Sequence, residues 1–180
     1  MWLQWILALF FRSKRGPKLD LTAVSRIGFR VWPTDVDLLM HMNNGRYLSY
    51  MDLGRVDLIE RTGVQAKLSV EGIYAVVAAQ TITYRKSLNL FQRFTIESKL
   101  LGADERSVYL EQRFTVRGQV YARAVVRGRF IRKGAGPVMV SEIGEITGSD
   151  WRQYELPPEV VAWSEDFRLP ASKADAPSIW

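Results

Sequence analysis

The chain has 180 residues, of which 47% are hydrophobic, 24% charged and 12% aromatic, a composition typical of one domain with a full hydrophobic core. It contains no cysteine and one histidine, which excludes disulfide scaffolds, thiolate nucleophiles, iron–sulfur clusters and zinc–thiolate sites. The net charge of +6 suits an anionic partner, namely nucleic acid, a membrane surface or a phosphorylated small molecule. A solvated, arginine-rich strand face is an equally good explanation of this charge.

The N-terminal segment is predicted to be a leader over residues 1–24. Residues 1–11, MWLQWILALFF, are apolar except for Gln4, and the basic run Arg12-Ser-Lys-Arg15 follows. A membrane-spanning helix needs roughly 20 apolar residues, and a signal peptide carries its positive charge before the apolar run. Two interpretations remain: an interfacial anchor that contacts a membrane surface through residues 1–15, or a helix docked on the domain.

A strand and a long helix are predicted next. Apolar residues alternate with polar or small ones over residues 25–31, which predicts a strand that ends at Pro33. A loop over 34–42 leads to a helix over 44–61, because apolar residues recur there at three- and four-residue spacing. The predicted buried face of this helix consists of Tyr47, Tyr50, Met51, Gly54 and Leu58. Residues 64–72 are predicted to be a short connection.

Four more strands are predicted at hairpin spacing, over residues 73–85, 91–101, 108–116 and 120–132. The first of them contains the apolar run Val-Val-Ala-Ala at 76–79, which suggests burial on both faces.

The predicted domain spans residues 25–140. The pattern fades from Gly134 onward, and residues 141–180 are predicted to be an acidic extension packed on the domain, with a short helix near 159–163.

These elements predict an α+β fold. One long helix cannot cover both faces of a five-stranded antiparallel sheet, but a curved sheet can wrap around one central helix. The sheet edges and the outer face then require a partner subunit. We therefore expect a homodimer or a larger assembly such as a dimer of dimers.

Polar residues gather where the first strand leads into the helix, over residues 35–45. Two carboxylates, the histidine and two asparagines are costly to bury there without a purpose. Asn43 or Asn44 can cap the helix, and the free N–H groups of its first turn can bind an anion or a developing oxyanion. Gly45 lets a ligand approach the backbone closely. The alternative is a capped, hydrogen-bonded turn with no further role.

The polar residues of this junction have a fixed spacing: Asp35-x-Asp37-x-x-x-His41-x-Asn43-Asn44-x-x-Tyr47. This motif is similar to the signature of hot-dog-fold thioesterases, a group that includes the 4-hydroxybenzoyl-CoA thioesterase family. The longer match, over residues 35–55, 76–101 and 109–114, resembles most the thioesterase superfamily member six subgroup. The chain departs from the pattern at Met40, which replaces the glycine that usually precedes the histidine and tightens the pocket.

The resemblance implies a hot-dog fold and a cofactor-free, metal-free thioesterase that cleaves an acyl thioester, either acyl-CoA or an acyl group on a carrier protein, to the free acid and thiol. It implies that Asp37 is the nucleophile or general base, and that His41 and Asn43 orient this carboxylate or the thioester oxygen. Backbone N–H groups at the helix start would form the oxyanion hole. The implied substrate-binding residues are Asn44, Gly45, Tyr47, Asp52, Arg85 and Lys86.

Two of these assignments have alternatives or extensions. Asp52 stands near the place where some hot-dog enzymes carry a catalytic glutamate in the helix. Arginines and a lysine at strand ends would meet the phosphates of CoA: Arg85, Lys86, Arg127, Arg129 and Arg132.

A competing hypothesis is a non-catalytic protein that binds acyl thioesters or lipids at a membrane surface, which the apolar leader favours. A hot-dog dehydratase is disfavoured because Met-Asn-Asn follows His41. Nucleic-acid binding is disfavoured because the basic residues come without a platform of stacking aromatics. We expect a cytoplasmic enzyme of fatty acid metabolism that contacts membranes through its N-terminus.

Overall fold

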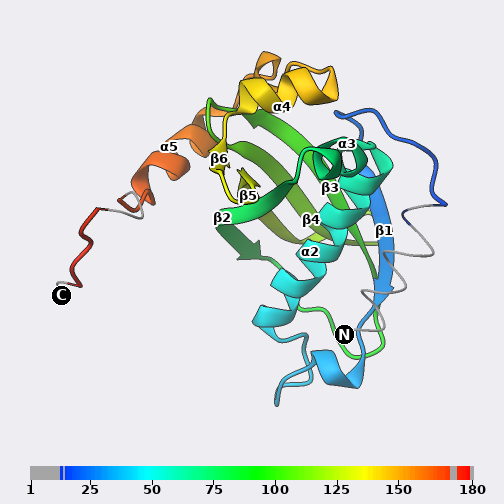
Figure 1. Ribbon diagram of the computed structural model, residues 1–180. Coiled ribbons are helices and arrows are strands. Elements are labelled where there is room, and N and C mark those ends of the chain that lie inside the picture. Colours follow the sequence, from blue (N-terminus) through cyan, green and yellow to red (C-terminus); the bar gives the residue numbers. More distant parts are fainter. Residues whose placement is uncertain (1–12, 14, 171–173, 179–180) are drawn as a thin grey trace.

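One strand and two α-helices precede a run of consecutive strands, and together they build one curved sheet around a central helix (Figure 1). The computed structural model describes residues 13, 15–170 and 174–178. The elements are β1 (Ser25–Arg30), η2 (Pro33–Asp35, a 3-10 helix), α2 (Asn44–Arg61), α3 (Val64–Val70), β2 (Ile73–Tyr84), β3 (Arg93–Ala103), β4 (Val108–Val116), β5 (Gln119–Arg132), β6 (Gly136–Val138), α4 (Val140–Thr147), η3 (Trp151–Gln153, a 3-10 helix) and α5 (Pro158–Asp166).

The strand order in the sheet is β1-β3-β4-β5-β2, and all neighbouring strands are antiparallel. The helix α2 crosses the concave side of this sheet (Figure 1) and packs against β1 and β3. A curved antiparallel sheet around one long helix is therefore confirmed. All five predicted strands are present, and in the described chain a sixth, β6, pairs with the end of β5. This strand has three residues and contains Pro137, too short for an alternating pattern.

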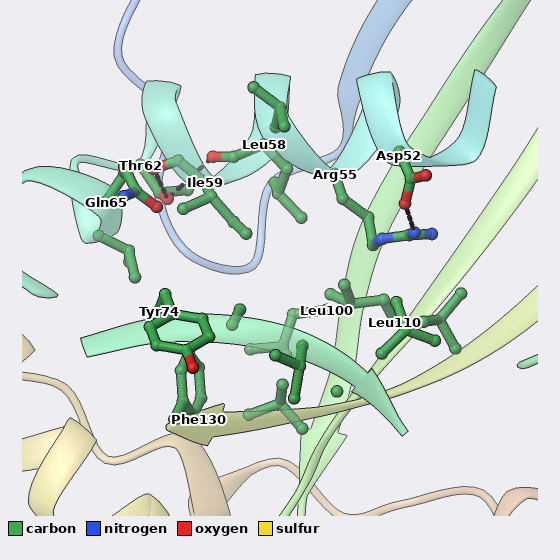
Figure 2. Close-up of a pocket in the computed structure, with 18 of the residues that line it drawn as sticks. Asp52, Arg55, Leu58, Ile59, Thr62, Gln65, Tyr74, Leu100, Leu110 and Phe130 are labelled. Atoms are coloured by element: carbon green, nitrogen blue, oxygen red, sulfur yellow. Dashed lines mark hydrogen bonds and ion pairs between the residues drawn. The ribbon is translucent and has the colours of Figure 1, made fainter. Parts of the chain in front are cut away.

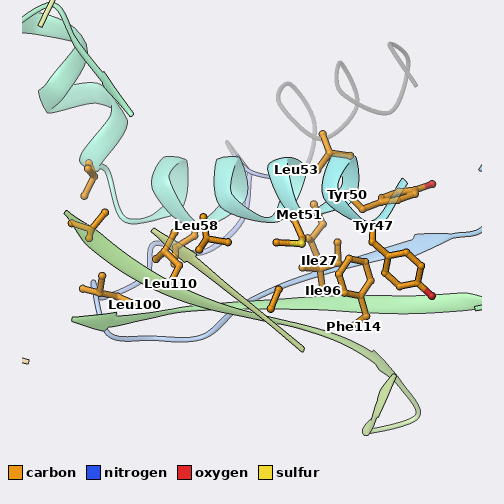
Figure 3. Close-up of a cluster of buried hydrophobic side chains, with 14 of the residues drawn as sticks. Ile27, Tyr47, Tyr50, Met51, Leu53, Leu58, Ile96, Leu100, Leu110 and Phe114 are labelled. Carbon is orange, nitrogen blue, oxygen red and sulfur yellow. The ribbon is translucent and has the colours of Figure 1, made fainter. Parts of the chain in front are cut away.

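Helix α2 begins and ends where capping groups are available. The side chain of Asn43 accepts a hydrogen bond from the Gly45 N–H at 2.9 Å, which satisfies one free donor of the first turn. After the last turn, Gly63 takes a left-handed φ of 73°. The predicted face of the helix is buried and points at the strands (Figure 3). This buried face is partly aromatic: the centre of the Tyr47 ring lies 4.8 Å from the centre of the Phe114 ring on β4.

Gly54 is the point of closest approach between α2 and the sheet. A Cβ at this position would lie 2.7 Å from Ile96 Cγ2, 2.8 Å from Gln112 Nε2 and 2.9 Å from Ser98 Oγ. We therefore expect Gly54→Ala to lower the free energy of unfolding by about 1–3 kcal/mol, since overpacking outweighs the gain in helix propensity. Chemical denaturation measures this, with Gly45→Ala as the control. A loss no greater than in the control would contradict this packing.

Two helices were not expected from the sequence. Residues 64–72 contain α3, whose Val64 and Leu68 are buried, instead of a plain connection. Beyond residue 134, α4 buries Val140 and Ile143. Both helices have eight residues or fewer, so their apolar spacing covers only about two turns. The predicted helix near 159–163 is present as part of α5.

The expected burial of β2 on both faces is wrong. β2 lies at the edge of the sheet, and its Tyr74 and Val77 side chains are 47% and 43% exposed. A bulge between Val77 and Ala79 interrupts its pairing with β5. The apolar run that suggested a central strand therefore lies on an edge with no neighbouring strand in the described chain.

The predicted membrane contact falls largely on residues 1–12 and 14, which lie outside the described residues. Ser13 is buried and donates a hydrogen bond to Asp57 Oδ1 on α2 at 3.0 Å. Arg61 Nε likewise donates to the Pro17 carbonyl oxygen at 3.0 Å. The end of the leader is therefore held along the C-terminal half of α2. Among the described residues, no helix has the length and apolar character needed to span a membrane.

Candidate active site

A tight turn carries the candidate catalytic residues just before α2. The Asp37 N–H donates to the His41 carbonyl oxygen at 2.9 Å, and the Met40 N–H donates to the Asp37 carbonyl oxygen at 3.0 Å. A β-bridge between Val36 and Met42 closes the base of the turn. The turn projects beyond the end of the sheet (Figure 1). Backbone bonds thus hold the Asp37 and His41 positions close together at an exposed end of the molecule.

Asp35 is a structural carboxylate. Its side chain is buried, and Oδ1 pairs with the Arg46 guanidinium at 2.9 Å. Its Oδ2 accepts hydrogen bonds from the Tyr50 hydroxyl at 2.7 Å and the Trp32 N–H at 2.9 Å. Four such bonds, including one from Arg46 Nε at 3.1 Å, leave this carboxylate no access to a substrate.

Asp37 presents the opposite arrangement. It is partly exposed, and its Oδ1 accepts a hydrogen bond from the Leu39 N–H at 2.9 Å. Its Oδ2 has no hydrogen-bond partner in the described part of the chain. One oxygen therefore fixes the orientation of the side chain, and the other is available to a water molecule or a carbonyl carbon.

The N-terminus of α2 offers fewer free donors than the sequence suggested. Asn43 takes up two N–H groups, since its side chain accepts from Gly45 at 2.9 Å and its carbonyl oxygen accepts from Arg46 at 2.8 Å. Asn44 is exposed, and its N–H makes no bond to the described residues. The predicted oxyanion hole is therefore reduced to the Asn44 N–H and the Asn43 side-chain amide, with the helix dipole behind them.

The connection between β2 and β3 supports this turn from the side. A β-bridge joins half-buried His41 to Asn89. The buried Tyr47 hydroxyl accepts a hydrogen bond from the Leu88 N–H at 3.3 Å, and its ring meets that of Tyr84 edge-on at 5.0 Å. Burial raises the pKa of the Tyr47 hydroxyl, so this group stays neutral. The side chain of Tyr47, predicted to bind substrate, lies in the hydrophobic core.

Asp52 lies two turns along α2 and forms an ion pair with Arg55. Arg55 is buried and also donates to Gln112 Oε1 at 2.8 Å, and Gln112 in turn donates to Ser98 Oγ at 2.9 Å. Burial lowers the pKa of the Arg55 guanidinium, while the pairing with Asp52 opposes that shift. Sequence reasoning missed Arg55, although an Asp and an Arg three residues apart in a helix are the signal of such a pair.

An apolar cavity of about 300 Å³ lies between the C-terminal half of α2, α3 and the strands β2 and β5. Figure 2 shows Asp52 and Arg55 at one end of it and Thr62 and Gln65 at the other. Most of its lining is aliphatic or aromatic, including Leu58, Val76, Leu100, Leu110, Val126 and Phe130. Its size and apolar lining suit an acyl or aryl group. Sequence reasoning missed the cavity, because its lining comes from elements scattered along the chain.

The turn that carries Asp37 and the cavity lie at different ends of α2. The turn precedes Asn44, whereas the cavity begins near Asp52, about 12 Å further along the helix. Within one copy of the chain, Asp37 therefore does not line the cavity.

The basic residues that were predicted to meet the phosphates of CoA differ in their surroundings. Arg85 donates to the Val120 carbonyl oxygen at 3.0 Å, and the Lys86 ammonium lies 5.6 Å from the Tyr121 ring, so both follow β2 at the end of the sheet that carries the turn. The predicted phosphate role is wrong for Arg127, which is 5% exposed and donates to the Ser164 carbonyl oxygen of α5.

Arg132 is also engaged within the chain. It pairs with Glu142 of α4 at 2.7 Å and lies 3.8 Å from Glu71. At the far end of the sheet, this arginine therefore links α4 to the strands, and its guanidinium is already neutralised.

Comparison with known proteins gives consistent matches. Residues 31–164 match the family described as the thioesterase-like superfamily. Protein THEM6 of Xenopus laevis is 36% identical over 133 residues, which cover 74% of this chain and 63% of that protein, so the match spans less than two thirds of that relative. The long-chain acyl-CoA thioesterase FadM of Escherichia coli is 32% identical over 93 residues, covering 51% of this chain and 70% of FadM.

Solved structures show the same architecture. The crystal structure of YbaW, a probable thioesterase from Escherichia coli, superimposes with a TM-score of 0.65 at 26% identity and covers 71% of this chain and 98% of YbaW. The motif around the turn before α2, the curved sheet and these matches agree. The chain belongs to the thioesterase-like superfamily and has its hot-dog fold.

Proposed function

We propose that this protein hydrolyses acyl-CoA thioesters to the free acid and CoA, with Asp37 as the catalytic carboxylate. The observation that carries the proposal is the contrast between the two aspartates of the motif. Asp35 is saturated by hydrogen bonds, whereas Asp37 is oriented through one oxygen and its other oxygen has no partner among the residues that the structure describes. The activity named for FadM, a long-chain acyl-CoA thioesterase, supports the choice of substrate class.

In the proposed reaction, the free Asp37 oxygen takes a proton from water as the water oxygen attacks the thioester carbonyl carbon. The Asn44 N–H and the Asn43 amide donate to the carbonyl oxygen, which becomes negatively charged. The tetrahedral intermediate then collapses, the carbon–sulfur bond breaks, and the leaving thiolate takes the proton from Asp37 to become the thiol, which restores the carboxylate. His41 lies at the other end of the turn and orients the acyl thioester or the carboxylate.

The active form is proposed to be a homodimer paired through β2. The free edge of β2 is apolar and exposed, which is a template for another strand. Two antiparallel β2 edges related by a two-fold axis place the Ile73 end of one copy beside the Tyr84 end of the other. Tyr84 lies against the start of α2, since its hydroxyl is 3.5 Å from the Asn44 carbonyl oxygen, and the cavity opens near Tyr74 and Val77. The Asp37 turn of one copy therefore meets the cavity of its partner.

Light scattering tests this assembly. The expected mass is twice the 20.6 kDa of the chain, and Val77→Lys on the β2 edge should shift the equilibrium toward monomer, because a lysine there places charge in the apolar pairing surface. Val161→Lys on α5, where the valine is 38% exposed, is the matched control and should leave the mass unchanged. A stable monomer of the unsubstituted chain at micromolar concentration would rule the dimer out.

The activity itself is tested with a panel of acyl-CoA chain lengths and a thiol-reactive dye. The chain has no cysteine, so every thiol that the dye detects comes from CoA. Saturable thiol release is expected with at least one chain length. Tight acyl-CoA binding with no release above the buffer rate would refute hydrolysis and favour the non-catalytic binding protein.

A further inference from the structure

A buried guanidinium stands in the wall of the apolar cavity. Arg55 lines this cavity, and its side chain is 10% exposed. A guanidinium can donate hydrogen bonds from each of its nitrogens. In the described part of the chain, Nη1 donates to Gln112 and Nη2 to Asp52, whereas Nε has no hydrogen-bond partner. Arg55 therefore keeps unused donors at the wall of a mostly apolar cavity.

The position of this guanidinium is fixed from the side of the sheet. Gln112 on β4 is fully buried, and its Nε2 donates to Ser98 Oγ at 2.9 Å and to the Met51 carbonyl oxygen at 3.0 Å. Its Oε1 accepts from Arg55 Nη1 at 2.8 Å. The guanidinium is thus held in place before a ligand arrives, so a hydrogen bond to a ligand costs little side-chain order.

The polar side chains at the other end of the cavity are already engaged within their helices. The Thr62 hydroxyl donates to the Leu58 carbonyl oxygen at 2.9 Å, and Gln65 Nε2 donates to Ser69 Oγ at 2.9 Å. The donor best placed to meet a ligand oxygen therefore belongs to Arg55.

The mouth of the cavity and Arg55 lie toward opposite ends of it. Figure 2 shows Tyr74, which lines the mouth, below Gln65, whereas Arg55 lies further along α2. In the proposed dimer the Asp37 turn of the partner copy meets this mouth, so the thioester lies there and the acyl group runs inward. The helix covers about 10 Å between positions 62 and 55, so the distal part of the acyl group reaches Arg55.

We infer that Arg55 is a specificity-determining residue that donates a hydrogen bond to a neutral oxygen on the distal part of the acyl group, so that hydroxylated acyl-CoA is preferred over plain acyl-CoA. The inference rests on the proposed function, which supplies the CoA thioester and its orientation. A plain alkyl chain would cover the unused donors and remove their water without offering an acceptor, which is unfavourable. A distal carboxylate would lie beside the carboxylate of Asp52, which opposes its binding.

Matched acyl-CoA substrates test this preference on the unsubstituted protein. The members of each set have the same chain length and end in a methyl group, a hydroxyl or a carboxylate. At the best-fitting length, kcat/KM should be about tenfold higher for the hydroxylated member than for the plain one. The carboxylated member should show no such gain. Equal kcat/KM for the plain and hydroxylated members at every length, or a preference for the carboxylate, would overturn the inference.

Arg55→Met removes the donors and keeps a long apolar side chain. The ratio of kcat/KM for hydroxylated over plain substrate should fall about tenfold, whereas a purely structural role would lower both values alike and leave the ratio unchanged. Arg61→Met is the matched control, because Arg61 is also paired with an aspartate of α2, Asp57 at 3.3 Å, but does not line the cavity. Its ratio should equal that of the unsubstituted protein. The comparison on the unsubstituted protein decides the inference if Arg55→Met does not fold.

Binding separates this inference from the proposed function. S-alkyl-CoA thioethers, with and without a terminal hydroxyl, contain no ester to cleave, and calorimetry on the unsubstituted protein should give about a tenfold lower Kd for the hydroxylated one. A protein that cleaves no acyl-CoA yet shows this difference would refute hydrolysis and keep the role of Arg55. A protein that cleaves acyl-CoA but binds the two thioethers equally would overturn the role of Arg55 alone.

Discussion

Replacing Asp37 with asparagine is expected to lower kcat at least about a hundredfold, because loss of a general base alone is worth about 10²–10⁴ in rate. Asparagine keeps the size of the side chain and its Oδ1 can still accept from the Leu39 N–H, so the turn should persist. The expected result is therefore a catalytic defect with an unchanged melting temperature. Steady-state thiol release from acyl-CoA and thermal unfolding, measured on the same preparation, check both parts.

Asp52→Asn is the comparison that decides between the two carboxylates. Asp52 is ion-paired with buried Arg55, so its loss leaves Arg55 with one hydrogen-bond partner fewer and should cost stability more than turnover. Near-normal turnover by Asp37→Asn together with abolished turnover by Asp52→Asn would show that the helix carboxylate is the catalytic one.

Replacing Asp35 with alanine is expected to destabilise the fold by about 3 kcal/mol, because it removes a buried carboxylate that accepts four hydrogen bonds, two of them from a guanidinium. The substitution removes an acceptor from the Arg46 guanidinium, the Tyr50 hydroxyl and the Trp32 N–H together. For a chain of 180 residues this corresponds to a fall in melting temperature of about 6–12 °C. Calorimetry measures it.

The informative control for Asp35 is the isosteric change. Asp35→Asn keeps an acceptor for Tyr50 and should lose less stability than alanine while still weakening the pair with Arg46. An Asp35→Ala protein as stable as the unsubstituted chain would contradict the structural role of this carboxylate.

The two aspartates of the motif show which features could be predicted from the sequence and which could not. Their spacing in the motif identified the superfamily, and the apolar repeat of residues 44–61 predicted α2 because a long, one-sided helix leaves an unambiguous period. Asn43 was one of two expected caps, and the structure selects it. The distinct roles of Asp35 and Asp37 could not be predicted, since their environments depend on Arg46 and other residues that fold onto the turn from α2 and the end of β1.

Three other features could not be predicted from the sequence, because they depend on tertiary structure alone. The run Val76–Ala79 has the composition of a central strand, but its place at the sheet edge follows from strand order, which alternation does not encode. The cavity exists because α2 packs on β1 and β3 and leaves space over β2 and β5. The sequence predicted Arg127 to be an exposed cation. In the structure α5 covers it, and the Ser164 carbonyl oxygen of α5 accepts its hydrogen bond.

The central claim is that Asp37 of one copy acts on a thioester whose acyl group occupies the cavity of the other copy, and subunit mixing tests it most directly. Asp37→Asn removes the base, and Ala75→Trp fills the cavity from β2, where Ala75 is exposed and lines the mouth. Each variant alone should be nearly inactive. After unfolding and refolding together, random pairing under two-fold symmetry should restore about one quarter of the unsubstituted activity, because each mixed dimer has one intact site. A mixture that forms mixed dimers and stays as inactive as its components would contradict the shared site.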